Sequence, residues 1–160
     1  MKFTASAALR DKLERLQALM RDADPDADLA TAIEAAVTEK LERLEARRFA
    51  KTSRPRKSVA DAKVTPTSRR IPAPIRRAVH ERDGGRCRYV DARGRRCTER
   101  HGLEFHHRYP YGLGGDHSVD NLALYCKTHN ALLAEQEYGR EKVARHRRDG
   151  SDRVSEARSA

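Results

Sequence analysis

The chain has 160 residues and a formal net charge of +10; 36% of its residues are charged, only 5% are aromatic and none is tryptophan. This composition allows only a modest hydrophobic core, which would need a bound metal or a partner chain for support. No stretch approaches the roughly 20 apolar residues that span a bilayer, and no apolar signal core begins the sequence, so we expect a cytoplasmic protein without membrane contacts.

Residues 1–50 are predicted to form two amphipathic helices. Apolar side chains recur at helical spacing in two groups: Leu9, Leu13, Leu16 and Met20, then Ile33, Val37, Leu41 and Leu44. Pro25 lies in the break between them, and Asp24, Asp26 or Asp28 could cap the second helix. Two such helices bury too little apolar surface to be stable alone, so their stripes should pack on a second copy or on the rest of the chain.

The same segment, preceded by Lys2, Phe3 and Thr4, resembles the ribbon-helix-helix group of dimeric DNA binders in its pattern. A coiled-coil or helical-hairpin dimerisation element explains that pattern equally well. Both interpretations predict a homodimer formed through residues 1–50.

Residues 51–70 are predicted to be a basic linker, because they lack periodicity and are rich in Ser, Thr, Pro and basic residues. Residues 1–50 hold nine Lys/Arg against ten Asp/Glu, whereas residues 51–82 hold ten against two. A basic stretch beside a folded module is typical of nucleic-acid binding, although a solvated linker without a partner has the same composition.

A short helix is predicted to start near Pro74, to place Ile75 and Val79 on one side and to end at Gly84 and Gly85 as a glycine cap. Beyond it, residues 103–107 (LEFHH) alternate like a strand, and a loop with Pro110 and glycines follows. Residues 121–126 (NLALYC) suggest a second strand or an extended turn, and a helix is expected from about His129. The fold class expected is therefore α+β, with a small strand-loop-strand-helix module after the helical pair.

The three cysteines, an odd number, make a poor disulfide framework and favour metal ligation. Cys87 and Cys97 form one pair, and Cys126 and His129 form a C-x-x-H pair. Together they supply four nitrogen and sulfur ligands for a structural zinc ion, which would also supply folding free energy to a region with few large apolar residues.

Three alternatives to this zinc site remain at the level of the sequence. His101 or His106 could replace His129 as the fourth ligand. The cysteines could instead be small buried apolar residues, with His129 a surface side chain.

Two motifs, E-F-H-H-x-x-P-x-x-x-G-G and N-L-x-L-x-C-x-x-H-N, resemble the His-Asn-His (HNH, or ββα-metal) endonucleases. Residues 71–138 resemble the zinc-containing bacterial branch of that family, and we place the expected HNH domain at residues 71–143. The resemblance implies a metal-dependent enzyme that hydrolyses DNA phosphodiester bonds.

The resemblance also implies a role for four residues. His107 would be the general base that takes a proton from the attacking water, and Asn121 would hold the loop that aims it. His106 and Asn130 would bind one catalytic divalent ion, Mg²⁺ or Mn²⁺. The family often has His where this chain has Asn130, so the preferred metal is open, although an amide oxygen suits a hard ion.

The chemistry of phosphodiester cleavage by itself also requires a base and a cation. A phosphodiester repels hydroxide and its cleavage builds charge on the departing 3′ oxygen, so a catalyst needs a base on one side and a cation on the other. Adjacent residues on an ideal strand point to opposite faces, so His106 and His107 can address one phosphate only if the strand ends or bulges there.

DNA, duplex rather than single-stranded, is the expected partner. The predicted phosphate contacts are Arg69, Arg70, Arg76, Arg77 and Arg108. Residues 144–160 read as a polar tail in which Arg145, Arg147 and Arg148 could add contacts. The alternative function is a non-catalytic, zinc-stabilised dimeric DNA-binding protein in which the paired histidines are structural.

Overall fold

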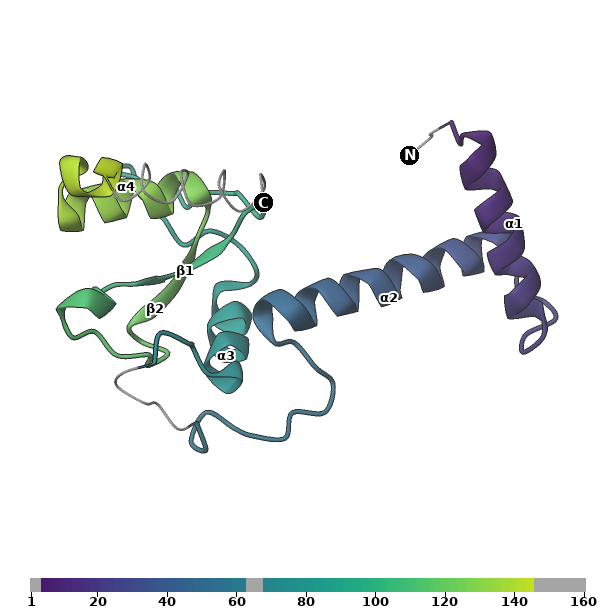
Figure 1. The fold of residues 1–160 in the computed structure, drawn as a ribbon, viewed down its shortest axis with the longest axis horizontal. Helices are drawn as coiled ribbons and strands as arrows, with labels where there is room; N and C mark the ends of the chain where they lie inside the picture. Colours follow the sequence, from purple (N-terminus) through teal and green to yellow (C-terminus); the bar gives the residue numbers. More distant parts are fainter. Residues whose placement is uncertain (1–3, 63–67, 146–160) are drawn as a thin grey trace, which may run out of the picture. The chain divides into compact units, whose positions relative to one another are not determined.

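The computed structural model describes residues 4–62 and 68–145. The chain divides into two compact units, Met1–Arg54 and Pro55–Ala160. Helices and a small two-stranded sheet make up the described residues, which confirms the α+β class (Figure 1). None of the helices in these ranges is long and apolar enough to cross a membrane.

The first unit is a pair of helices, as predicted. Helix α1 (Ala7–Arg21) is capped by the Ser6 hydroxyl, which accepts a hydrogen bond from the backbone of Leu9. Helix α2 (Leu29–Phe49) is capped by Asp28, the last of the three aspartates considered, because its carboxylate accepts the N–H of Thr31 at 2.8 Å. Residues 2 and 3 of the expected leading segment lie outside the described residues.

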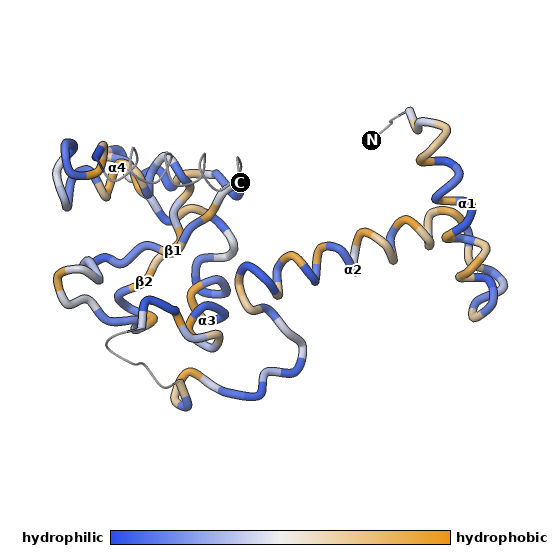
Figure 2. The backbone as a smooth tube through the Cα atoms, viewed as in Figure 1, coloured by the Kyte–Doolittle hydropathy of each residue, from blue (hydrophilic) through white to orange (hydrophobic). Residues whose placement is uncertain are grey.

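The two helices meet only near the start of α2 (Figure 1). The buried residues there are Ala27 and Ala32. Farther along α2, apolar residues recur between polar ones (Figure 2), and the side chains of Val37, Leu41 and Leu44 are exposed by 59%, 54% and 50%. The first unit therefore leaves a row of apolar side chains uncovered by its own residues.

The second unit is built around an antiparallel hairpin of two strands, β1 (Glu104–His107) and β2 (Leu122–Tyr125). In their register, His106 pairs with Ala123 and His107 pairs with Leu122. Residues 122–124 of β2 are all completely buried, so this strand forms the centre of the core. The hairpin thereby fixes the paired histidines at the end of β1.

Two helices cover the hairpin. Helix α3 (Ala73–Asp83) packs on β2 through Ile75 and Val79 and ends at Gly84, whose φ of 64° is the left-handed conformation expected of a glycine cap. Helix α4 (Lys127–Tyr138) contacts both strands (Figure 1). It starts two residues earlier than the predicted His129, immediately after Cys126. A 3₁₀ turn, η1 (Tyr111–Leu113), lies in the loop between the strands.

A buried carboxylate joins α3 to β2. Asp83, 1% exposed, accepts the backbone N–H of Leu124 at 2.9 Å and hydrogen bonds from the guanidinium groups of Arg82 and Arg88. Arg82 also donates to the carbonyl oxygens of Val119 and Leu122. This network ties the end of α3 to the strand that leads into α4.

Candidate active site and metal centre

Cys87, Cys97, Cys126 and His129 come together in one cluster. Their ligand atoms all lie within 4.8 Å of one another. The His129 Nδ1 stands 3.2 Å from the Cys126 Sγ and 3.5 Å from the Cys87 Sγ. In tetrahedral zinc sites the ligand atoms stand roughly 3.5–3.8 Å apart, so this donor set and spacing fit a structural zinc ion.

Local hydrogen bonds explain how residues so far apart in sequence meet. The loop that carries the first two cysteines folds back on itself, because the Cys97 N–H donates to the Tyr89 carbonyl and the Cys87 N–H donates to the Glu99 carbonyl. Cys126 precedes the first residue of α4, so His129 follows one helical turn later on the same side.

Metal binding must remove the protons from the thiols of the cluster. Burial and the neighbouring Cys126 raise the pKa of the Cys87 thiol to about 11. A metal ion reverses this effect, because coordination deprotonates a thiol outright. Tyr89 stacks on the His129 ring with centroids 3.8 Å apart and holds the imidazole in place. These residues can therefore hold zinc.

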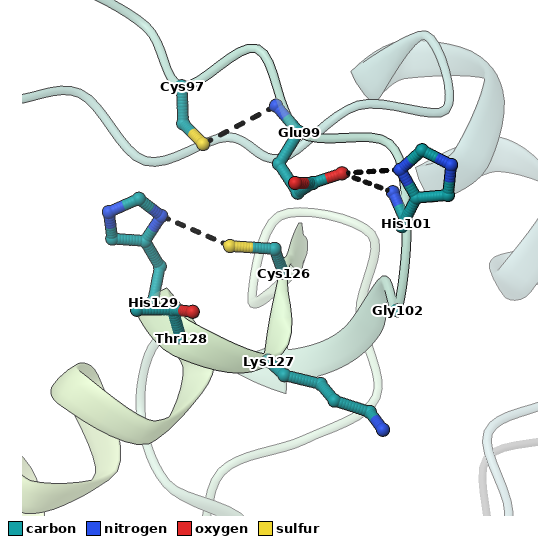
Figure 3. Close-up of a pocket in the computed structure, with 8 residues that line it drawn as sticks. All are labelled: Cys97, Glu99, His101, Gly102, Cys126, Lys127, Thr128 and His129. Carbon is teal, nitrogen blue, oxygen red and sulfur yellow. Dashed lines mark hydrogen bonds and ion pairs between the residues drawn. The ribbon is translucent and has the colours of Figure 1, made fainter.

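His101 is not part of the cluster. Its side chain is exposed and its Nδ1 lies 2.8 Å from the Glu99 carboxylate (Figure 3). In the same view, the Cys97 and Cys126 sulfur atoms face the His129 ring. His106 lies in a separate group of side chains. The cluster that forms therefore contains His129 and neither of the alternatives.

His107, the predicted base, is the last residue of β1 and contacts another histidine. Its Nε2 lies 2.9 Å from Nδ1 of His117, and the Nε2 of His117 lies 2.7 Å from the Ser68 carbonyl oxygen. Tyr111 lies parallel to the His117 ring at 5.0 Å. His117 is 1% exposed. A buried histidine of the loop between the strands therefore packs against the predicted base.

The electrostatics around His107 favour its neutral form. Burial lowers the pKa of its imidazole below the usual value, the nearby His117 and His106 lower it further, and Asp116 opposes them. Below neutral pH a larger share of this imidazole therefore keeps its lone pair than for a free histidine. A neutral imidazole is the form that accepts a proton.

His106 and Asn130 meet in a second polar group. The His106 Nδ1 lies 2.7 Å from the Asn130 Oδ1, so β1 and the first turn of α4 bring the two predicted ligands together. Two carboxylates complete the group: Glu137 lies 2.9 Å from the His106 Nε2, and Glu104 accepts from the Asn130 Nδ2 at 2.5 Å. The His106 ring is 9% exposed. The imidazole nitrogen of His106 and the amide oxygen of Asn130 are donors that suit Mg²⁺ or Mn²⁺.

Asn121 ties together the loop between the strands. Its amide donates to the carbonyl oxygens of Tyr109 and Asp116, and its Oδ1 accepts the N–H of Tyr109 at 2.7 Å. A Cβ on Gly115 would overlap the Tyr109 carbonyl. The second glycine of the G-G pair is therefore required for the two sides of this loop to touch.

The predicted phosphate contacts differ in their surroundings. Arg69, Arg70 and Arg108 are exposed, and so is Arg145. Arg76 is partly buried over the Phe105 ring, and Arg77 donates to the Lys57 carbonyl at 2.8 Å. The side chains of Arg147 and Arg148 belong to residues outside the described ranges.

Four residues with defined contacts were not identified from the sequence. No sequence pattern distinguishes His117, Glu104 or Glu137 from ordinary loop, strand and helix residues. Asp83 did give a signal, because an acidic residue in the last turn of a helix opposes the helix dipole and therefore points to a tertiary partner.

Comparison of the chain with protein-family models, with curated proteins and with solved structures found no match.

Proposed function

We propose that the second unit is a metal-dependent endonuclease of the HNH type, which hydrolyses phosphodiester bonds of duplex DNA. One observation supports this proposal above the others. A neutral histidine, His107, ends β1 beside His106, whose ring meets Asn130 from α4. The base and the cation that phosphodiester cleavage requires are thus assigned to neighbouring groups of side chains.

The contacts of His107 determine which nitrogen would act as the base. A carbonyl oxygen only accepts, so the His117 Nε2 must donate its proton to Ser68. The Nδ1 of a neutral His117 then accepts, so the Nε2 of His107 carries a proton and donates it. The lone pair of His107 therefore resides on Nδ1, which would take the proton from the attacking water, and His117 acts as a positioning residue.

His106 and Asn130 would hold the catalytic Mg²⁺ or Mn²⁺. When bound there, the ion would stabilise the negative charge that develops on the phosphate and on the departing 3′ oxygen. The products expected are a 5′-phosphate and a 3′-hydroxyl. Asn121 contributes indirectly, because its three hydrogen bonds fix the loop beside His107.

The cysteine cluster would hold zinc in a structural role. It fastens the loop that begins at Cys87 to the start of α4, and Asn130 follows His129 directly. Exposed arginines would contact the DNA backbone, with Arg69, Arg70 and Arg108 the first candidates because all three are exposed. These contacts position the protein and do not read the base sequence.

The test is nicking of supercoiled plasmid by the purified full chain, with Mg²⁺, Mn²⁺ or EDTA, beside zinc analysis of each sample. His107→Ala should abolish nicking and keep its zinc. His101→Ala is the matched control, because that imidazole is exposed and outside both groups, and it should nick like wild type.

Three outcomes would count against the proposal. Nicking that persists in EDTA would exclude a catalytic Mg²⁺ or Mn²⁺. Nicking that survives in His107→Ala would exclude this base. No nicking by wild type, combined with tight DNA binding, would instead indicate the non-catalytic DNA-binding protein.

A further inference from the structure

The carboxylate of Glu104 fixes the orientation of the Asn130 amide. A carboxylate only accepts hydrogen bonds, so the group 2.5 Å from the Glu104 Oε2 must be the NH₂ of Asn130. The amide oxygen then faces the Nδ1 of His106 at 2.7 Å, and it too can only accept.

The carboxylate of Glu137 likewise determines which group donates on the other side of the His106 ring. Its oxygen lies 2.9 Å from Nε2, so this nitrogen must carry a proton and donate it. A neutral imidazole has one N–H group. The Nδ1 of His106 is then left with a lone pair that faces the lone pairs of the Asn130 oxygen.

Two lone pairs at 2.7 Å repel each other unless a positive charge lies between them. In octahedral Mg²⁺ sites, with metal–oxygen distances of about 2.0–2.1 Å, neighbouring ligand atoms stand about 3 Å apart. The His106 and Asn130 atoms are thus spaced almost as a pair of ligands to one ion. A histidine that binds a metal commonly donates its other N–H to a carboxylate, which is the position of Glu137.

We propose that Glu137 and Glu104 are positioning residues of this divalent-ion site, an inference that rests on the metal pair of the proposed function. Glu137 holds the proton of His106 on Nε2 and so leaves Nδ1 as the ligand atom. Glu104 holds the NH₂ of Asn130 and so aims its carbonyl oxygen at the ion. The two carboxylates also add negative charge near the cation. Neither residue touches the ion or the substrate.

The opposing explanation is a doubly protonated His106 that donates to both Asn130 and Glu137 without any ion. This imidazolium would satisfy both hydrogen bonds of the ring and would repel a divalent cation. The two explanations predict opposite effects of removing Glu137. Without that carboxylate, affinity for a cation falls if Glu137 supports a metal ligand, and it does not fall if Glu137 only pairs with an imidazolium.

The experiment measures Mn²⁺ affinity of the full-length, zinc-loaded protein by electron paramagnetic resonance of the free ion. Glu137→Ala should bind Mn²⁺ about 10–100-fold more weakly than wild type, the range for loss of such a partner. Glu137→Gln should lie between them, because its amide oxygen still accepts the N–H but carries no charge. Glu104→Ala should also weaken binding. Glu141→Gln, an exposed glutamate beyond α4, should bind like wild type.

A second readout observes the tautomer directly. In the Mg²⁺-saturated protein, ¹⁵N spectra of His106 should show the proton on Nε2 and none on Nδ1. Protons on both nitrogens, or unchanged Mn²⁺ affinity in Glu137→Ala, would overturn the inference. Zinc content and thermal unfolding show whether each variant is folded, and Glu137→Gln, similar in shape to the native residue, serves if the alanine variant is not.

Failure of this inference is distinguishable from failure of the proposed function. If wild type nicks DNA through His107 while Glu137→Ala keeps its Mn²⁺ affinity, the endonuclease stands and the role of Glu137 falls. If Mn²⁺ binding depends on Glu137 but no nicking occurs, the ion site stands and the endonuclease falls.

Discussion

The Asp83 carboxylate accepts a hydrogen bond from the backbone N–H of Leu124 at 2.9 Å, across 41 positions of sequence. Burial by itself raises the pKa of this carboxyl, but hydrogen bonds from Arg82, Leu124 and Arg88 outweigh burial and lower the pKa below its usual value. The charged form is therefore the one that stabilises the fold.

We predict that Asp83→Asn lowers the free energy of unfolding at pH 7 by roughly 1.5–3 kcal/mol, the range for hydrogen bonds to a charged group, because the partly exposed Arg82 guanidinium loses its fully buried partner. A group whose pKa is depressed in the folded state stabilises above its unfolded pKa, about 3.9, and loses this contribution as pH falls through the folded value. The difference between wild type and variant, measured by urea unfolding, should thus shrink below about pH 4.

Asp120→Asn, at an exposed position, is the control for that measurement and should change stability little at any pH. Zinc release in acid affects all three proteins, so the difference between them isolates the carboxylate. A gap between wild type and Asp83→Asn that stays constant from pH 7 to pH 3 would contradict the assigned role.

Removal of zinc should unfold the second unit and leave the first intact. Cys126→Ser and Cys87→Ser should each lose the ion, since loss of a ligand from a structural site costs folding free energy. The measurement is zinc stoichiometry together with amide exchange of β2, which is fully buried. We expect one zinc ion per wild-type chain, and fast exchange of the β2 amides only in the zinc-free variants. Protected β2 amides in zinc-free protein would show that the cluster is not needed for folding.

Gly115→Ala should disturb the loop around the candidate base. Its methyl group would overlap the Tyr109 carbonyl, so the loop held by Asn121 must move. A displacement of about 1 Å at a catalytic group can cost on the order of 10²-fold in rate, and we expect a nicking loss of that size. Gly112→Ala is the matched control, because its nearest contact is the Tyr138 hydroxyl at 3.7 Å. Equal activity of the two variants would remove this explanation for the glycine pair.

The exposed stripe of α2 predicts self-association of the first unit. We propose that a second copy covers Val37, Leu41 and Leu44, since no described residue of their own unit does. Leu41→Glu should convert a dimer into a monomer in analytical ultracentrifugation, because burying an unpaired charge in an apolar interface has an unfavourable free energy. Thr38→Glu, at an exposed position beside the stripe, should leave the mass unchanged. A wild-type monomer at all concentrations would refute the homodimer.

Exposed arginines should contribute to DNA affinity through phosphate contacts. Arg69→Ala combined with Arg70→Ala should weaken binding to all duplex sequences and lower the slope of log affinity against log salt by about 1 for each lost contact. The comparison variant is Arg95→Ala, which lies outside the predicted contacts and whose guanidinium already pairs with the Asp91 carboxylate. If the slope of log affinity against log salt is unchanged in the double variant, Arg69 and Arg70 do not contact the DNA phosphates.

Periodicity and turn chemistry were sufficient to predict the regular elements. The helix from near Pro74 to Gly84, the two strands and an aspartate cap for α2 each follow from short-range patterns, which depend on local backbone preferences, although the sequence left the cap open among three aspartates. The start of α4 was placed two residues late, because Cys126 is not a typical capping residue.

The side-chain partners could be predicted only in part. Residue type and spacing were sufficient to predict that the three cysteines and His129 form one metal site, because zinc binds few kinds of side chain. His117 and Glu137 lie 10 and 31 positions from their partners in the histidine pair. Such contacts depend on how a loop closes and how a helix is rotated, and a single sequence encodes neither in a readable pattern.

The contact between His117 and the Ser68 carbonyl affects how this unit can be cut out or transplanted. A fragment begun at residue 71, the first residue of the proposed HNH domain, would lack the acceptor that orients the two imidazoles, although every proposed catalytic and metal-binding residue would be present. The chain of hydrogen bonds could then reverse, with the His107 proton moving to Nδ1. A minimal fragment or a fusion protein that is meant to keep its chemistry should therefore retain the backbone from Ser68 onward.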